Sequence, residues 1–170
     1  MANTNHLSVS IAKKAAGQVA AELIQNGMIV GLGTGSTARF FIESLGKRCR
    51  EGLKISAIAT SKQSTHLANE LGIPLIDPDN ITSVDITVDG ADEIDQNKNM
   101  IKGGGGALLR EKLLALSSRE MIVIIDQTKI VENLGKHPLP VEIAQFIYQT
   151  TIHRIEDEGL EGKLRETKRA

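Results

Sequence analysis

Apolar residues follow two alternating patterns through most of the chain. Stretches with apolar side chains three or four residues apart alternate with short apolar runs of strand length. The first pattern predicts helices at residues 9–23, 38–45, 64–71 and 107–116. The second predicts strands at residues 28–32, 55–59, 73–76, 84–88 and 121–125. This alternation is typical of an α/β fold with an open, mainly parallel, Rossmann-like sheet flanked by helices.

The pattern changes after residue 135. The segment 136–141 contains two prolines, and residues 153–170 contain ten charged residues of mixed sign. This end is predicted to form either a helix followed by a tail or the beginning of a second unit. In open parallel sheets, ligands bind beyond the carboxyl ends of the strands. Functional residues are therefore expected directly after the predicted strands.

The first such segment is Gly31-Leu-Gly-Thr-Gly-Ser-Thr37, between a predicted strand and a predicted helix. Its glycines allow close backbone approach, and Thr34, Ser36 and Thr37 add hydroxyl donors where a helix N-terminus favours an anion. The pattern indicates a phosphate cradle. It is not the dinucleotide-binding fingerprint, because the glycine spacing differs and no acidic residue lies about 20 positions further on. A plain strand-to-helix turn with a Ser/Thr cap would show the same residues.

The second segment is Asp89-Gly-Ala-Asp-Glu93, at the end of the strand predicted for 84–88. Asp89 and Asp92 are three residues apart across a Gly-Ala turn, so both carboxylates can face one crevice and carry out acid-base chemistry. A solvated Asp-Gly turn is the alternative. Residues 95–99 have the acidic and amide spacing of a calcium loop, but the required glycine and closing glutamate are missing.

The third segment is Lys102-Gly-Gly-Gly-Gly-Ala-Leu-Leu-Arg-Glu-Lys112. Four consecutive glycines before a helix indicate backbone N–H groups that wrap closely around an oxyanion or a carbonyl. Lys102 adds positive charge, and Glu111 lies about one turn into the helix, where its carboxylate can reach the same site. A flexible glycine linker is the alternative, although such linkers are normally longer and flanked by polar residues.

Composition narrows the possible functions. Hydrophobic residues make up 41% and charged residues 24% of the chain, as in ordinary folded domains. The net charge of -1 supplies no broad basic surface, so a nucleic-acid partner is not expected. No apolar run approaches the roughly 18 residues of a membrane span, and the single Cys49 with no signal-peptide pattern points to the cytoplasm. The four histidines have no ligand spacing and no cysteine partners, so a metal site is not expected.

Four stretches in this order, GLGTGST, VDGADEID, KGGGGALLREK and LGKHPLPVE, resemble the signature segments of ribose-5-phosphate isomerase of the A type. The resemblance implies an enzyme of the pentose phosphate pathway that interconverts D-ribose 5-phosphate and D-ribulose 5-phosphate through an ene-diolate. It also implies a homodimer or homotetramer that works without a metal or an organic cofactor. Residues 1–135 would form a Rossmann-like catalytic domain, and residues 136–170 would begin a small C-terminal subdomain that continues further in the family.

The resemblance also implies roles for single residues. Glu111 would be the proton-transferring base, Lys102 would stabilise negative oxygens, and Asp89 or Asp92 would move protons between sugar oxygens. The implied substrate-binding residues are Lys13, Thr34, Gly35, Ser36, Thr37, Asp89, Gly90, Ala91, Asp92, Lys102, Gly103, Gly104, Gly105 and Lys129. Two alternatives remain open: a non-catalytic sugar-phosphate sensor domain, and a related sugar-phosphate deaminase or CoA-transferase-like enzyme.

Overall fold

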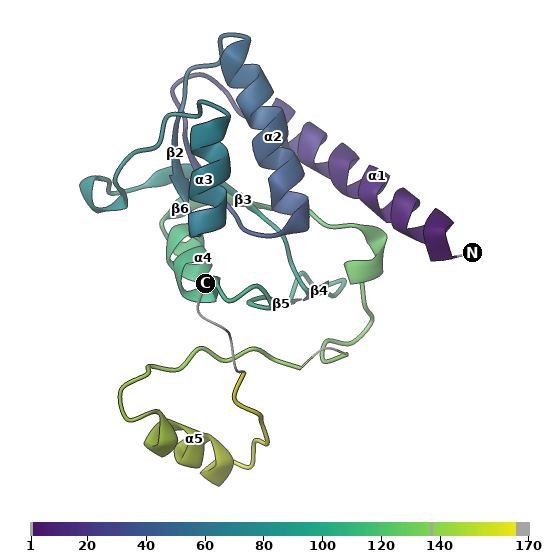
Figure 1. Ribbon diagram of the computed structural model, residues 1–170, viewed down its shortest axis with the longest axis vertical. Coiled ribbons are helices and arrows are strands. Elements are labelled where there is room, and N and C mark those ends of the chain that lie inside the picture. The colour runs from purple at the N-terminus through teal and green to yellow at the C-terminus, as the bar shows by residue number, and fades with distance from the viewer. Residues whose placement is uncertain (1, 137, 166–170) are drawn as a thin grey trace. The chain divides into compact units, whose positions relative to one another are not determined.

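The computed structural model describes residues 2–136 and 138–165, which divide into two units between Pro140 and Val141. The first unit contains a parallel sheet with helices packed around it (Figure 1). The sheet has four strands in the order β2-β1-β3-β6. Its strands are β1 (Ile29–Leu32), β2 (Ser56–Ala59), β3 (Val84–Asp89) and β6 (Ser118–Val123). Its helices are α1 (Ala2–Glu22), α2 (Ser36–Arg50), α3 (Lys62–Glu70) and α4 (Leu108–Leu116). The predicted α/β fold class is confirmed.

The helices cover both faces of the sheet because side chains alternate along each strand. On β1, Val30 and Leu32 are fully buried in the main core, together with residues of α1, α2 and α3. Gly31 faces the opposite way, where Leu114 of α4 lies close to its backbone. Strand β1 is therefore buried on two sides, which explains why it appears in the sequence as a continuous apolar run.

Helices α1 and α2 cross at close range. A Cβ atom added at Gly17 would lie 2.6 Å from the backbone nitrogen of Phe41, so only glycine permits this approach. The guanidinium group of Arg48 donates hydrogen bonds to the carbonyl oxygens of Ala21 and Ile24, the latter over 2.7 Å. These bonds satisfy carbonyl groups that a helix end leaves without intrahelical partners.

Some bounds differ from the sequence-based expectation: α1 begins at residue 2 rather than 9, and β6 covers residues 118–123 rather than 121–125. Two parts of the fold also differ in kind. The strand predicted at 73–76 is reduced to a single bridge from Leu75 to Ala57, since Pro74 accepts a bond from Ala57 but has no N–H to donate. An antiparallel hairpin, β4 (Glu93–Ile94) with β5 (Met100–Ile101), was not predicted. Strands of two residues are too short to show an alternating pattern.

Within the described residues, the remaining elements are two 3₁₀ turns and one helix. Two 3₁₀ turns lie at Pro78–Asn80 and Gln127–Lys129. The second unit contains α5 (Tyr148–Asp157), which begins after Ile147 in a left-handed conformation and has no buried side chain. Across residues 2–136 and 138–165, no helix is long and apolar enough to cross a membrane.

Phe41 provides a test of the core. Its side chain is fully buried in the main core, so Phe41→Ala is expected to lower the free energy of unfolding by about 3–5 kcal/mol in denaturant titrations. Phe146→Ala is the matched control, because Phe146 is 83% exposed and the change should stay within about 0.5 kcal/mol. Equal losses in the two variants would contradict this view of the core.

Candidate active site

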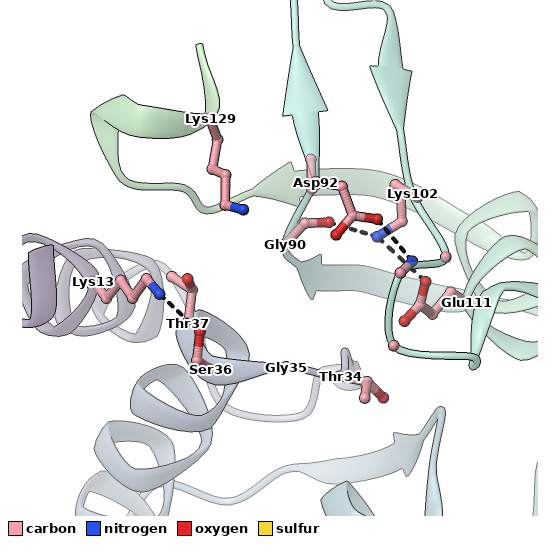
Figure 2. Close-up of a pocket in the computed structure, with 14 residues that line it drawn as sticks. Lys13, Thr34, Gly35, Ser36, Thr37, Gly90, Asp92, Lys102, Glu111 and Lys129 are labelled. Carbon is pink, nitrogen blue, oxygen red and sulfur yellow. Dashed lines mark hydrogen bonds and ion pairs between the residues drawn. The ribbon is translucent and has the colours of Figure 1, made fainter. Parts of the chain in front are cut away.

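A pocket of about 150 Å³ lies beyond the carboxyl ends of β1 and β3, which are neighbours in the sheet (Figure 2). The three motif segments meet there, as expected for this class of sheet. The pocket is lined by Lys13, Thr34, Gly35, Ser36, Thr37, Gly90, Ala91, Asp92, Lys102, Gly103, Gly104, Gly105, Glu111 and Lys129. Every residue predicted for the site is in this lining except Asp89.

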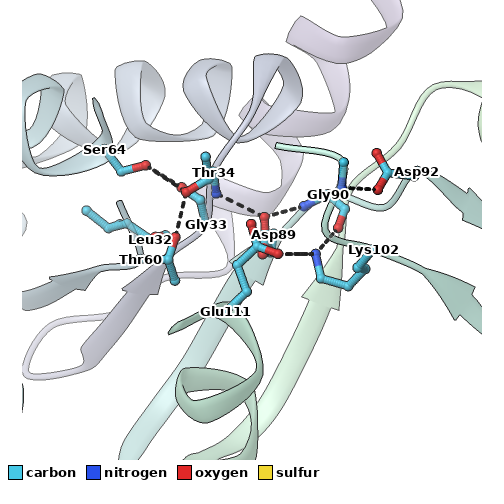
Figure 3. A network of polar contacts seen from close by, with 11 residues as sticks. Leu32, Gly33, Thr34, Thr60, Ser64, Asp89, Gly90, Asp92, Lys102 and Glu111 are labelled. Carbon is cyan, nitrogen blue, oxygen red and sulfur yellow. Dashed lines mark hydrogen bonds and ion pairs between the residues drawn. The ribbon is translucent and has the colours of Figure 1, made fainter. Parts of the chain in front are cut away.

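Asp89 lies beneath the pocket and is 1% exposed. Its Oδ1 accepts hydrogen bonds from the backbone N–H groups of Thr34 at 3.0 Å and Gly90 at 2.7 Å, and its Oδ2 accepts one from Lys102 Nζ at 3.0 Å (Figure 3). One carboxylate thus joins all three motif segments. Gly33 makes this possible, because a Cβ atom there would lie 2.2 Å from Asp89 Oδ1.

Glu111 lies in the first turn of α4 with 6% of its surface exposed. Its Oε2 is 3.4 Å from Lys102 Nζ, which also donates to the carbonyl oxygen of Gly90. Burial and the nearby charge of Asp89 raise the pKa of Glu111, and the opposing effect of Lys102 does not cancel them. The carboxyl group is therefore a stronger base than an exposed glutamate.

Asp92 is half-buried and lines the pocket opposite the Thr34–Thr37 segment. Its Oδ2 accepts a hydrogen bond from the backbone N–H of Gly104 at 2.8 Å. The run of four glycines after Lys102 is thus held by a side chain of the Asp89–Glu93 segment. The N–H of Gly104, predicted to face an oxyanion, donates to this carboxylate.

The other end of the pocket is cationic. Lys13 Nζ donates to Ser36 Oγ at 2.9 Å, and Figure 2 shows the ammonium groups of Lys13 and Lys129 on the same side as Ser36 and Thr37. Helix α2 begins at Ser36, so its N-terminus adds partial positive charge. Two lysines, two hydroxyls and a helix N-terminus form a site suited to a phosphate group.

Sequence reasoning missed three buried polar residues that support this lining. Asp126, 2% exposed, lies 3.8 Å from Lys13 Nζ. Burial raises the pKa of Asp126, but hydrogen bonds from Thr128 and the nearby lysines lower it by more. Thr60 and Ser64 lie behind Thr34, with Oγ1–Oγ1 and Oγ1–Oγ distances of 2.7 and 3.4 Å. Thr60 and Asp126 directly follow predicted strands, whereas Ser64 begins a predicted helix.

Metal-binding side chains do not gather in the described part of the chain. Within residues 2–136 and 138–165, no three His, Cys, Asp or Glu side chains are arranged to hold a metal ion. His137 lies outside the described residues.

Comparison with known proteins points to a single enzyme family. A model of the family described as ribose 5-phosphate isomerase A (phosphoriboisomerase A) matches residues 56–170. Ribose-5-phosphate isomerase A of Protochlamydia amoebophila is 55% identical over 165 residues, covering 97% of this chain and 71% of the relative. The corresponding protein of Bacillus mycoides is 51% identical over 153 residues, covering 90% of this chain and 69% of the relative.

Solved structures show the same relationship. Ribose 5-phosphate isomerase from Plasmodium falciparum superposes with a TM-score of 0.88 at 40% identity, covering 93% of this chain and 71% of that one. A D-ribose-5-phosphate isomerase in complex with phospho-erythronic acid superposes with a TM-score of 0.88 at 37% identity, covering 94% and 71%.

The open parallel sheet and the pocket at its carboxyl edge define an α/β enzyme with a cationic end and a buried carboxylate-lysine pair. The chain belongs to the ribose 5-phosphate isomerase A family. It is accordingly an isomerase.

The raised pKa of Glu111 predicts a pH-dependent effect on stability. The native state holds the Glu111 proton more tightly than the unfolded state, so its stabilising contribution is full below the ordinary glutamate pKa and is lost as pH rises through the raised pKa. Glu111→Gln removes this loss. In urea titrations, the free energy of unfolding of the variant minus that of the original chain should be larger at pH 8 than at pH 4, so the variant gains relative stability as pH rises. A difference between the two free energies that does not vary with pH would contradict the raised pKa of Glu111.

Proposed function

We propose that this chain interconverts D-ribose 5-phosphate and D-ribulose 5-phosphate through an ene-diolate, with Glu111 as the proton-transferring base. The observation that carries the proposal is the buried Glu111 carboxylate beside Lys102, facing the same pocket as the cationic end. A phosphorylated sugar has one anionic end and one carbonyl end, which match the cationic end of the pocket and the end that holds Glu111 and Lys102. The relative in complex with phospho-erythronic acid binds a phosphorylated sugar acid, a ligand of the same kind.

The substrate phosphate is assigned to the cationic end. Lys13 and Lys129 supply positive charge there, and Ser36 and Thr37 supply donors at the N-terminus of α2. This placement leaves the first two carbons of the open-chain sugar at the opposite end, beside Glu111 and Lys102.

The reaction moves one proton between adjacent carbons. Glu111 removes the proton from C2 of the aldose, and the C2–H electron pair forms the C1–C2 double bond while the carbonyl electrons move onto O1. Lys102 Nζ, whose side chain is 14% exposed, stabilises this negative oxygen. A proton passes from the C2 hydroxyl to O1, and Glu111 returns its proton to C1 as the carbonyl forms at C2.

Asp92 is the better placed of the two aspartates to carry the proton between the sugar oxygens. It lines the pocket, whereas Asp89 lies outside the lining and already accepts three hydrogen bonds. We assign Asp89 a different part: it orients Lys102 and raises the pKa of Glu111 through its charge. Efficient general bases have pKa values near the working pH, so this charge favours proton abstraction.

Incubation with ribose 5-phosphate in deuterated water tests the reaction class. Ketose formation together with deuterium incorporation at the exchanging carbon is the expected result, followed by mass spectrometry or NMR. Ketose formed without any exchange would favour a hydride shift over the ene-diolate, and absence of ketose would exclude the proposed function.

Glu111→Gln is expected to lower kcat by about 100-fold or more, the usual contribution of a positioned general base. In the original chain, kcat should fall as pH is lowered through the raised pKa of Glu111, because only the ionised carboxylate accepts a proton. Glu120→Gln, at an exposed carboxylate on β6, is the matched control and should leave turnover unchanged. Near-original turnover in Glu111→Gln would remove this residue from the mechanism.

Chelation tests the proposal that no metal takes part. Lys102 supplies the positive charge that a metal ion would otherwise provide, so EDTA treatment followed by dialysis should leave the isomerisation rate unchanged. Loss of activity that a divalent cation restores would contradict this assignment.

A further inference from the structure

Two buried hydroxyl groups lie behind the Gly33–Thr37 segment without entering the pocket lining (Figure 3). Thr60, directly after β2, is 1% exposed, and Ser64, in the first turn of α3, is 4% exposed. Both contact Thr34, which lines the pocket. Buried hydroxyls with defined partners fix the direction of hydrogen bonds, because each hydroxyl has a single proton.

The proton of Thr60 is already used. Thr60 Oγ1 donates to the carbonyl oxygen of Leu32 at 3.0 Å. In the 2.7 Å contact between Thr60 Oγ1 and Thr34 Oγ1, geometry alone allows either atom to donate. The Leu32 carbonyl can only accept and Thr60 has a single hydroxyl proton, so both contacts of Thr60 Oγ1 are satisfied together only when Thr34 donates. In this arrangement the Thr34 proton points away from the pocket.

Ser64 and Asp89 remove the remaining ambiguity. Ser64 Oγ donates to the carbonyl oxygen of Gly33 at 2.7 Å, so it has no proton to give to Thr34 across their 3.4 Å contact. The backbone N–H of Thr34 donates to Asp89 Oδ1 at 3.0 Å. Both donors of Thr34 are therefore bound within the protein, and its hydroxyl oxygen offers only acceptor capacity to a ligand.

We propose that Thr60 is a positioning residue that fixes Thr34 as a hydrogen-bond acceptor and thereby orients the substrate. A sugar hydroxyl can donate to such an oxygen, whereas an ionised phosphate has no proton to donate and is repelled by the lone pairs. The phosphate is then directed to Lys13, Ser36 and the other donors at the cationic end. This inference rests on the proposed isomerase function. It adds a reason why the sugar phosphate binds in one orientation, with its phosphate at the cationic end.

Thr60→Val tests the inference, because valine keeps the shape of threonine and removes the acceptor for the Thr34 proton. Losing one oriented hydrogen bond should raise KM for ribose 5-phosphate by about 3- to 10-fold. The inhibition constant of inorganic phosphate, which needs only the cationic end, should change by less than about twofold. Thr60→Ser keeps the hydroxyl and should leave KM close to that of the original chain.

A double variant separates positioning from general damage. If Thr60 acts through Thr34, Thr60→Val should not raise KM further in a Thr34→Val background. Unchanged KM in Thr60→Val, or a parallel rise in the phosphate inhibition constant, would overturn the inference while leaving the isomerase function intact. An original chain that does not convert ribose 5-phosphate would instead refute the proposed function and this inference together.

Discussion

The buried carboxylate of Asp89 is the interaction on which the rest of the site depends. It ends β3, a strand flanked by β1 and β6, and receives donors from all three motif segments at distances of 2.7–3.0 Å. A buried charge is costly unless it is paired and hydrogen-bonded, so these donors offset the cost of placing Asp89 there. The same bonds fix the spacing between the Thr34–Thr37 segment and Lys102.

Asp89 and Glu111 show how environment separates two carboxylates that share one lysine. Lys102 Nζ lies 3.0 Å from Asp89 Oδ2 and 3.4 Å from Glu111 Oε2. Asp89 also accepts two backbone N–H bonds, and its charge raises the pKa of Glu111. One carboxylate is thereby suited to holding structure and the other to exchanging a proton, which is the division of roles expected when neighbouring acids have different surroundings.

The sequence predicts most of the helices and strands and the site segments, but not which site residues are buried or which distant residues contact them. Long elements such as α2 and β3 bury one stripe or a whole run of side chains, so their periodicity is visible. The sequence of the Asp89–Asp92 turn shows that two carboxylates are close, yet burial of Asp89 depends on the close approach of Gly33, which directly follows β1. Thr60 belongs to no motif, because its role comes from a contact with Thr34, 26 positions away.

The two ends of the pocket differ in how their donors are used, and this difference follows from the fold. At the N-terminus of α2, the helix leaves N–H groups without intrahelical partners, so the pocket gains donors there. Thr34 follows β1, and the two strands that flank β1, β2 and β3, place Thr60 and Asp89 close enough to bind both donors internally. Neighbouring positions in one short loop thus acquire opposite hydrogen-bonding character. The order of strands in the sheet, rather than the loop residues alone, sets the polarity with which the pocket meets a ligand.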